Sequence, residues 1–180
     1  METHVLVCHP DTLPIAVQRI EARLIPGNDD WLRLRFRIDG CSQLVLPAFA
    51  GRGRADGLWQ TTCFELFVQQ PDAAAYTEFN LSPSERWAAY DFAGYRDGMC
   101  NRKLPREPVC TARVGQQLAI FDAAIPSSAL PKTPWRYGLS AVIEETGGTK
   151  SYWALMHSAG APDFHHPACF AATLPAPEQP

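Results

Sequence analysis

The sequence of 180 residues lacks a long hydrophobic run and an excess of basic charge. No stretch approaches the roughly 20 apolar residues that a membrane-spanning helix needs. Sixteen basic residues stand against 19 acidic ones, and the net charge of -3 provides no basic field for phosphates. Residues 1–4 lack the basic start and apolar run of a signal peptide. These absences exclude nucleic acid and membrane partners, and we expect a cytoplasmic protein.

Closely spaced cysteine pairs are also missing. The six cysteines are Cys8, Cys41, Cys63, Cys100, Cys110 and Cys169, with no C-x-x-C pair among them. Wide spacing is typical of buried thiols in a reducing compartment, and an even count leaves a disulfide framework as the alternative. Zinc bound by thiolates is disfavoured, because such sites draw their ligands in closely spaced pairs.

Catalytic motifs are scarce as well. The chain has no G-x-S-x-G, no H-E-x-x-H and no P-loop. Residues 51–57 are rich in glycine, but they miss the dinucleotide-binding spacing and lead into a predicted strand instead of a helix. We therefore expect no catalytic residue, no metal and no cofactor.

Turn-forming residues and strand-like alternation of apolar and polar residues are abundant. Sixteen prolines and 12 glycines divide the chain into short segments, and hardly any window has helical periodicity. Residues 31–38 alternate apolar side chains with Arg33, Arg35 and Arg37, which predicts a strand with one face in the core and a row of guanidinium groups in water. It is expected to pair with residues 17–25 across a turn at residues 26–29.

The predicted fold is an all-β, two-sheet antiparallel β-sandwich or jelly roll with very little helix. A single helical turn is expected at residues 127–130, entered through Pro126 and capped by serine. Residues 1–173 form the predicted domain, and residues 174–180 a proline-rich C-terminal tail. The remaining predicted strands are residues 4–8, 42–46, 62–69, 76–81, 87–92, 109–114, 117–124, 136–144, 151–156 and 169–174.

Acidic and amide side chains stand among apolar ones in two of these strands. Alternation places Glu65 on one face with Phe67, and Glu78 with Asn80. Carboxylates and an amide on a strand face, with Trp59 nearby, are suited to gripping a polyhydroxylated ligand. A solvated sheet face is the alternative interpretation.

Four segments, residues 59–65, 76–83, 121–126 and 152–167, occur in an order that resembles the DOMON-like group related to family 9 carbohydrate-binding modules. The resemblance covers residues 59–170. It implies a β-sandwich that binds a small polar ligand, above all a saccharide, without catalysis. It also implies that Trp59 and Trp153 clamp a sugar ring while Glu65 binds hydroxyl groups.

The sequence departs from this family in two places. Thr61, Thr62 and Cys63, and then Gln69 and Gln70, replace acidic residues that many relatives carry, so a calcium site is not expected. Lys150 stands where the sugar-binding relatives tend to have an amide, so sugar specificity does not carry over from the resemblance.

Several alternatives stay open. Aromatic and arginine side chains also suit a protein-interaction module. Met99 and His157 could ligate haem, and Glu65 with Glu78 could serve a glycoside hydrolase. Other polar groups are candidates too: Arg86 could contact a hydroxyl or anionic substituent, and a loop holds Asp163, His165 and His166, which we expect to shape one end of the sandwich rather than bind metal.

Overall fold

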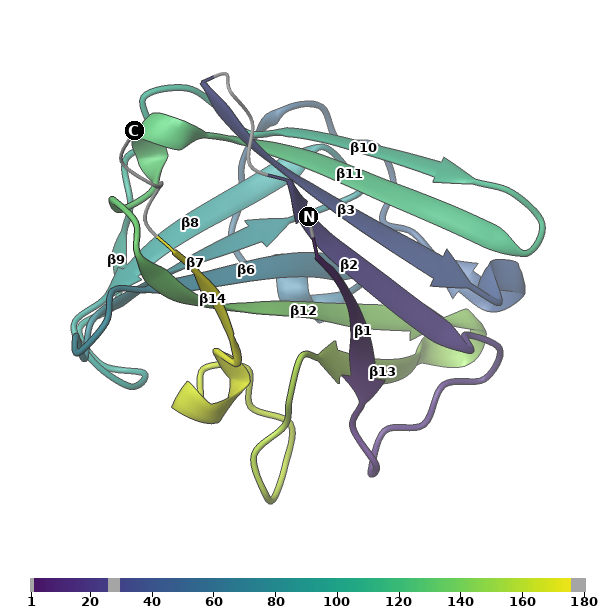
Figure 1. The fold of residues 1–180 in the computed structure, drawn as a ribbon. Helices are drawn as coiled ribbons and strands as arrows, with labels where there is room; N and C mark the ends of the chain where they lie inside the picture. The colour runs from purple at the N-terminus through teal and green to yellow at the C-terminus, as the bar shows by residue number, and fades with distance from the viewer. Residues whose placement is uncertain (1, 26–29, 176–180) are drawn as a thin grey trace.

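Short strands and 3₁₀ turns make up the computed structural model, which describes residues 2–25 and 30–175 (Figure 1). The all-β prediction is confirmed, and within those ranges no α-helix is formed. The strands are β1 (Thr3–Cys8), β2 (Arg19–Ile25), β3 (Trp31–Asp39), β4 (Leu44–Val45), β5 (Gly53–Arg54), β6 (Cys63–Gln69), β7 (Tyr76–Leu81), β8 (Arg86–Phe92), β9 (Cys100–Asn101), β10 (Val109–Val114), β11 (Leu118–Pro126), β12 (Trp135–Glu145), β13 (Thr149–Ala154) and β14 (Ala172–Leu174).

The strands follow one continuous path, β10-β11-β3-β2-β1-β13-β12-β6-β7-β8-β5. Strands β14 and β4 add to β12, and β9 adds to β8. The β5–β8 pair is parallel, so the sheet is mixed. In Figure 1 the strands β10, β11, β3 and β2 form one layer, and β8, β7, β6 and β12 form the layer that faces it.

A sandwich of two separate sheets, or a jelly roll, is not confirmed, because β1 joins the two layers. Residues Thr3 to Leu6 pair with β2, whereas Val7 and Cys8 pair with β13. Hydrogen bonding therefore continues around the corner through one strand. The result is a single sheet curled into a half-barrel.

Strand β3 has the alternation that its sequence predicts. Leu34 and Phe36 are buried, while Arg35 and Arg37 lie on the outside and pair with carboxylates. Arg35 Nε lies 2.6 Å from Asp122 Oδ1 on the neighbouring strand β11. The predicted pairing of β3 with the segment before it is also confirmed, since β2 is its antiparallel neighbour.

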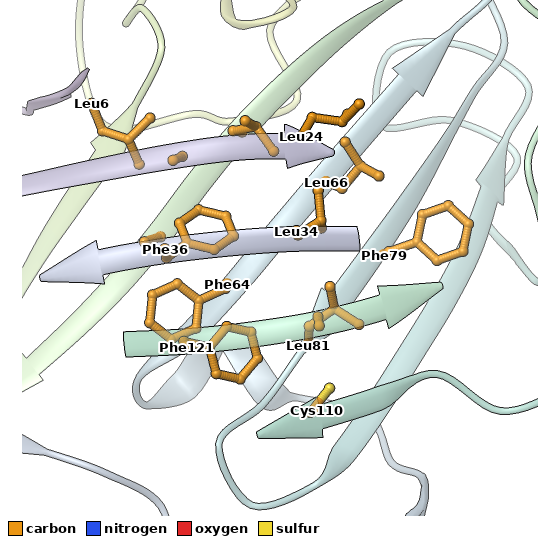
Figure 2. Packing of buried hydrophobic residues seen from close by; sticks show 14 of the residues in the cluster. Leu6, Leu24, Leu34, Phe36, Phe64, Leu66, Phe79, Leu81, Cys110 and Phe121 are labelled. Atoms are coloured by element: carbon orange, nitrogen blue, oxygen red, sulfur yellow. The ribbon is translucent and has the colours of Figure 1, made fainter. Parts of the chain in front are cut away.

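The main core fills the space between the two layers (Figure 2). Phe64 of β6 stacks on Phe121 of β11 with ring centroids 4.2 Å apart, and it lies 4.8 Å from Phe36 of β3. Offset aromatic pairs at such separations contribute beyond the area that they bury. These contacts hold the curled halves of the sheet together.

A second apolar cluster lies on the opposite side of β6, β7, β8, β12 and β13, which we call the outer face. It includes Phe67, Tyr76 and Phe92, covered by Phe164 and Phe170 from residues 155–171. Gly138 of β12 allows this close cover, because a Cβ there would lie 2.8 Å from the carbonyl oxygen of Cys169. The segment between β13 and β14 is thus packed against the outer face.

Some local predictions differ from the structure. Residues 42–46 were expected to form a strand, but Cys41–Gln43 is a 3₁₀ turn and only Leu44–Val45 pairs, with β12. Likewise, Pro167–Cys169 is a 3₁₀ turn and only Ala172–Leu174 forms a strand. In both places the pairing partner is distant in sequence, which a local pattern does not contain.

The turns and termini complete the comparison. Ser127–Ala129 forms the expected helical turn, although no side chain caps it. The turn predicted at residues 26–29 lies outside the described residues, as do residues 176–180 of the predicted tail. Leu174, where that tail was expected to begin, still pairs with Trp135. Across the described ranges, no helix has the length and apolar character needed to cross a bilayer.

Candidate functional site

Two carboxyl groups point from neighbouring strands of the outer face. Glu65 of β6 is directly opposite Asn80 of β7, and Phe67 is opposite Glu78. Glu65 and Glu78 are therefore diagonal neighbours on one face, a relation that sets residues roughly 7–8 Å apart and their Cβ atoms somewhat closer. The predicted sharing of a face within each strand is confirmed by this register.

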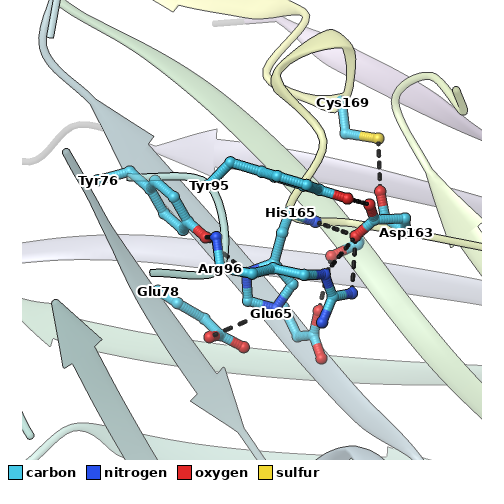
Figure 3. Close-up of polar contacts among 9 residues, drawn as sticks. Glu65, Tyr76, Glu78, Tyr95, Arg96, Asp163, His165 and Cys169 are labelled. Atoms are coloured by element: carbon cyan, nitrogen blue, oxygen red, sulfur yellow. Dashed lines mark hydrogen bonds and ion pairs between the residues drawn. The ribbon is translucent and has the colours of Figure 1, made fainter. Parts of the chain in front are cut away.

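Both carboxyl groups border a pocket of about 470 Å³. Its floor comes from five strands, and its rim from the turn before β6, from residues 93–99 and from residues 155–166. Figure 3 shows Glu65 and Glu78 beside the rim residues Arg96 and His165. The lining residues are Trp59, Glu65, Glu78, Tyr90, Phe92, Arg96, Met99, Val142, Tyr152, Pro162, Phe164 and His165.

The two acids are deeply buried. Glu65 is 3% exposed and Glu78 is 6% exposed. Ser140 Oγ donates to Glu65 Oε2 at 3.0 Å, and Asn80 Nδ2 donates to Glu78 Oε1 at 2.9 Å. Burial raises the pKa of Glu65 well above its usual range, and the neighbouring Glu78 adds to the rise. Burial likewise raises the pKa of Glu78 to about 7, against opposing effects of Asn80 and Arg96.

An ion pair fixes the rim of the pocket. Arg96 donates through Nη2 to Asp163 Oδ1 at 2.7 Å, and Tyr95 donates its hydroxyl to Asp163 Oδ2. Arg96 also has a positive φ of 52°, which turns its backbone N–H to within 3.2 Å of the Tyr76 hydroxyl. The loop after β8 is thereby tied to the loop after β13 (Figure 3).

His165 links this rim to the acids. Its Nδ1 lies 2.8 Å from the Tyr76 hydroxyl, and its Nε2 lies 3.9 Å from Glu78 Oε2. Burial lowers the pKa of His165 to about 4, with Arg96 contributing in the same direction. The imidazole is therefore neutral near pH 7 and does not supply Glu78 with a counter-charge.

Aromatic rings form much of the wall. Trp59, on the 3₁₀ turn Leu58–Gln60, is 46% exposed at the mouth. Tyr90 and Tyr152 line the interior, and the Tyr90 hydroxyl donates to Asp56 Oδ1 at 2.6 Å. The pocket thus combines apolar ring faces with buried carboxyl groups, a combination suited to a ligand with both apolar and polar surfaces.

The structure brings together three of the six residues predicted to bind ligand. Trp59, Glu65 and Glu78 line the pocket. Asn80 is fully buried beside them and acts as a hydrogen-bond donor to Glu78. Arg86 lies elsewhere, where its Nη2 donates to the carbonyl oxygen of Ala50 at 2.6 Å.

Trp153 does not join this set. It is 4% exposed in the main core, and its Nε1 donates to Ser151 Oγ at 2.9 Å. Successive residues of a strand point to opposite faces, so Tyr152 lies on the outer face when Trp153 lies in the core. The predicted clamp of two indole rings is therefore not formed, and the wall at this strand is a phenol ring.

Sequence reasoning missed several lining residues, chiefly those of the two loops. From sequence, Arg96 is a candidate only in the way that Arg86 is, as a contact for a hydroxyl or anionic substituent, and His165 only as part of an ordered loop. Their contribution depends on the contact between Arg96 and Asp163, which lie 67 positions apart in the chain. Tyr152 could have been found from strand alternation had Trp153 been assigned to the core.

The described residues contain no cluster of metal ligands, and only one of the two candidate haem ligands lines the pocket. Across the residues that the structure describes, no three His, Cys, Asp or Glu side chains converge on one point. Asp163 binds Arg96, His165 faces Tyr76, and His166 Nδ1 accepts from the Ala168 N–H. Met99 borders the pocket, but His157 is not among the lining residues, and its Nε2 lies 2.9 Å from the Val7 carbonyl oxygen.

Comparison with known proteins gives a likeness in fold. No protein-family model and no curated protein matches the sequence. A provisionally assigned carbohydrate-binding protein from Bacteroides uniformis ATCC 8492 superposes with a TM-score of 0.64 at 16% identity, over 93% of this chain and 83% of that chain. A family 9 carbohydrate-binding module from Caldicellulosiruptor kristjanssonii, solved in complex with glucose, gives a TM-score of 0.47 at 13% identity, over 79% of this chain and 69% of that chain.

Proposed function

We propose that this protein binds a small saccharide in the pocket around Glu65 and Glu78 and does not transform it. One observation carries the proposal: two buried carboxyl groups share a pocket of about 470 Å³ with aromatic walls. Ligand sites typically combine apolar lining with a few directed polar groups in this way. A concave site also favours a small ligand over a partner protein docking on a flat patch.

The chemistry of the pocket suits a sugar ring. Trp59 offers an exposed indole face to C–H groups at the mouth. A carboxyl group held protonated can both donate and accept hydrogen bonds, so Glu65 and Glu78 can pair with hydroxyl groups in either direction. Tyr152, rather than Trp153, supplies the second aromatic surface in this proposal.

The likeness in fold supports the proposal, because the Bacteroides uniformis protein is assigned to carbohydrate binding and shares most of its length with this chain. Membership of the DOMON-like group, which rests on the order of the four sequence segments, is part of the same proposal. A cytoplasmic location is proposed as well, from the features of the sequence alone.

A glycoside hydrolase is the second candidate, because two carboxyl groups occupy one pocket. Hydrolysis needs one carboxyl group as acid and the other ionised as base or nucleophile, in environments that push the two pKa values apart. Here burial raises the pKa of both groups. The likeness in fold to the Bacteroides uniformis protein, rather than these shifts, favours binding over catalysis in this proposal.

To test the proposal, the protein is titrated with a panel of mono- and disaccharides. Binding is measured by tryptophan fluorescence and by calorimetry. Trp59→Ala should weaken binding of the responding sugar about tenfold, a loss of about 1.4 kcal/mol. Trp31→Ala is the matched control, since Trp31 lies at the start of β3 under the guanidinium group of Arg106. Its affinity should equal that of the parent protein.

Two results would count against the proposal. If no sugar binds, the proposal of saccharide binding is wrong. If Trp59→Ala and Trp31→Ala lose the same affinity, the sugar does not bind in this pocket. Turnover of an aryl glycoside that is abolished by Glu65→Gln would instead establish the hydrolase.

A further inference from the structure

Glu65 and Glu78, the two acids of the pocket, are buried without an ion pair to an arginine or lysine side chain of the described residues. In the described part of the chain, no arginine or lysine forms an ion pair with Glu65 or Glu78, although both are buried. Glu65 Oε2 has the Ser140 hydroxyl and Glu78 Oε1 has the Asn80 amide, which are neutral donors. Buried acids are normally paired, so this pair stands out as a place for a positive group from outside.

We propose that the pocket selects a saccharide carrying a primary ammonium group, which it seats against Glu65 and Glu78. This inference rests on the proposed saccharide binding and specifies the class of ligand, an amino sugar with a free amine. The ammonium group has three donors, and the two carboxyl groups supply acceptors from neighbouring strands. N-acetylation would remove both the charge and two of those donors.

The charges around the acids leave a negative balance. Arg96 is the cation on the rim, and Asp163 neutralises it at 2.7 Å. His165 faces Glu78 as a neutral imidazole, since burial lowers its pKa to about 4. Burial raises the pKa of Cys63, Tyr76 and Tyr90, so these groups near the acids are neutral near pH 7. Arg96 lowers the pKa of both acids, but its direct ion pair is with Asp163, so among the described residues the negative charge of the ionised acids is only partly balanced.

The aromatic walls of the pocket also favour binding of a cation. Phe92, Tyr152 and Phe164 line the pocket together with the acids, whereas the Tyr90 ring already has the Arg54 guanidinium 5.3 Å from its centroid. Ring faces attract an ammonium group electrostatically, and the attraction is stronger where water is excluded. A site of carboxyl groups and aromatic rings therefore distinguishes an amine from a hydroxyl of the same size.

Ligand entry should also move protons. Burial raises the pKa of both acids, that of Glu78 to about 7, so near pH 7 the empty pocket binds protons more readily than free carboxyl groups do. An ammonium group beside them favours the carboxylate form, and the displaced protons pass to the buffer. A neutral sugar lacks this effect.

Calorimetry with glucosamine, N-acetylglucosamine and glucose near neutral pH tests the inference. Glucosamine should bind about tenfold more tightly than either neutral sugar, and it should release protons, detected by repeating the titration in two buffers of different ionisation enthalpy. Glucose or N-acetylglucosamine binding as tightly as glucosamine would overturn the amine preference and leave saccharide binding intact. Failure of all three to bind, with silence across the wider panel, would overturn both proposals.

Variants connect the preference to the two acids. The double variant Glu65→Gln with Glu78→Gln keeps the shape of the side chains and should bring the glucosamine-to-glucose affinity ratio close to one. Glu107→Gln, at an exposed position outside the pocket, should keep the ratio of the parent protein. A double variant that melts cooperatively and retains the full preference would contradict the seating of the amine.

Discussion

Two groups of buried acids in this protein are held in opposite ways. Glu145, the last residue of β12, is fully buried and accepts hydrogen bonds from the backbone N–H groups of Ile15, Ala16 and Val17 at 2.5, 2.7 and 3.1 Å. Glu65 and Glu78 are buried almost as deeply, yet each accepts only one hydrogen bond from the described side chains. The first carboxyl group is enclosed by donors, whereas the other two face a pocket.

This difference separates a structural acid from candidate binding acids. Three N–H groups converging on one carboxylate fasten the segment between β1 and β2 to the end of β12. Carboxyl groups left short of donors cost stability when they ionise, and such a cost is typical of residues placed for function. Burial alone therefore does not identify the site, but burial without enough donors does.

The largest effect is expected at the structural acid. Glu145→Ala removes the acceptor of three backbone N–H groups, so the free energy of unfolding should fall by roughly 3–5 kcal/mol. Chemical denaturation measures the loss. Glu144→Ala, one position earlier and only partly buried, is the matched control and should cost under about 1 kcal/mol. Equal losses in the two variants would mean that the converging donors add nothing.

Replacing Glu78 is expected to change the free energy of unfolding in the opposite direction. Burial raises its pKa from 4.5 to about 7, so between these values the folded state binds the proton more tightly than the unfolded chain. The free energy of unfolding should therefore fall as the pH rises through this window. Glu78→Gln removes the titration and should make the protein more stable by about 3 kcal/mol above pH 7, with little change at about pH 4.

Denaturation of the parent protein and of Glu78→Gln across this pH range measures the effect. Glu107→Gln should follow the parent curve, because Glu107 is exposed. If Glu78→Gln also follows that curve, Glu78 titrates alike in the folded and unfolded states, and the contrast with Glu145 is lost.

The sequence predicted the parts of the fold that depend on alternation. Strand β3 and the shared faces of Glu65 and Glu78 follow from a period of two residues, which local sequence contains. The rim of the pocket cannot be predicted from local sequence, because Arg96 and Asp163 are 67 positions apart in the chain. Similarly, the corner made by β1 depends on its pairing with both β2 and β13, a long-range choice that no segment encodes alone.

Trp153 illustrates a different limit. Alternation fixes that Tyr152 and Trp153 point to opposite faces, but it does not say which face meets the core. The family resemblance predicted that Trp153 would contact the ligand. In the curled sheet Trp153 packs in the core, and Tyr152 lines the pocket. A local pattern can therefore define a pair of faces without identifying the functional one.

The smallest expected effects sharpen the comparison at these two neighbours. Tyr152→Ala removes a ring from the pocket wall and should weaken binding of the responding sugar about fivefold, near 1 kcal/mol. Trp153→Phe loses the hydrogen bond to Ser151 and some core volume, so it should lower the free energy of unfolding by about 1 kcal/mol and leave affinity unchanged. Calorimetry and denaturation on both variants separate the effects. A loss of affinity in Trp153→Phe that matches the loss in Tyr152→Ala would mean that the inner face also determines the shape of the pocket, and binding could then not be assigned to the outer face alone.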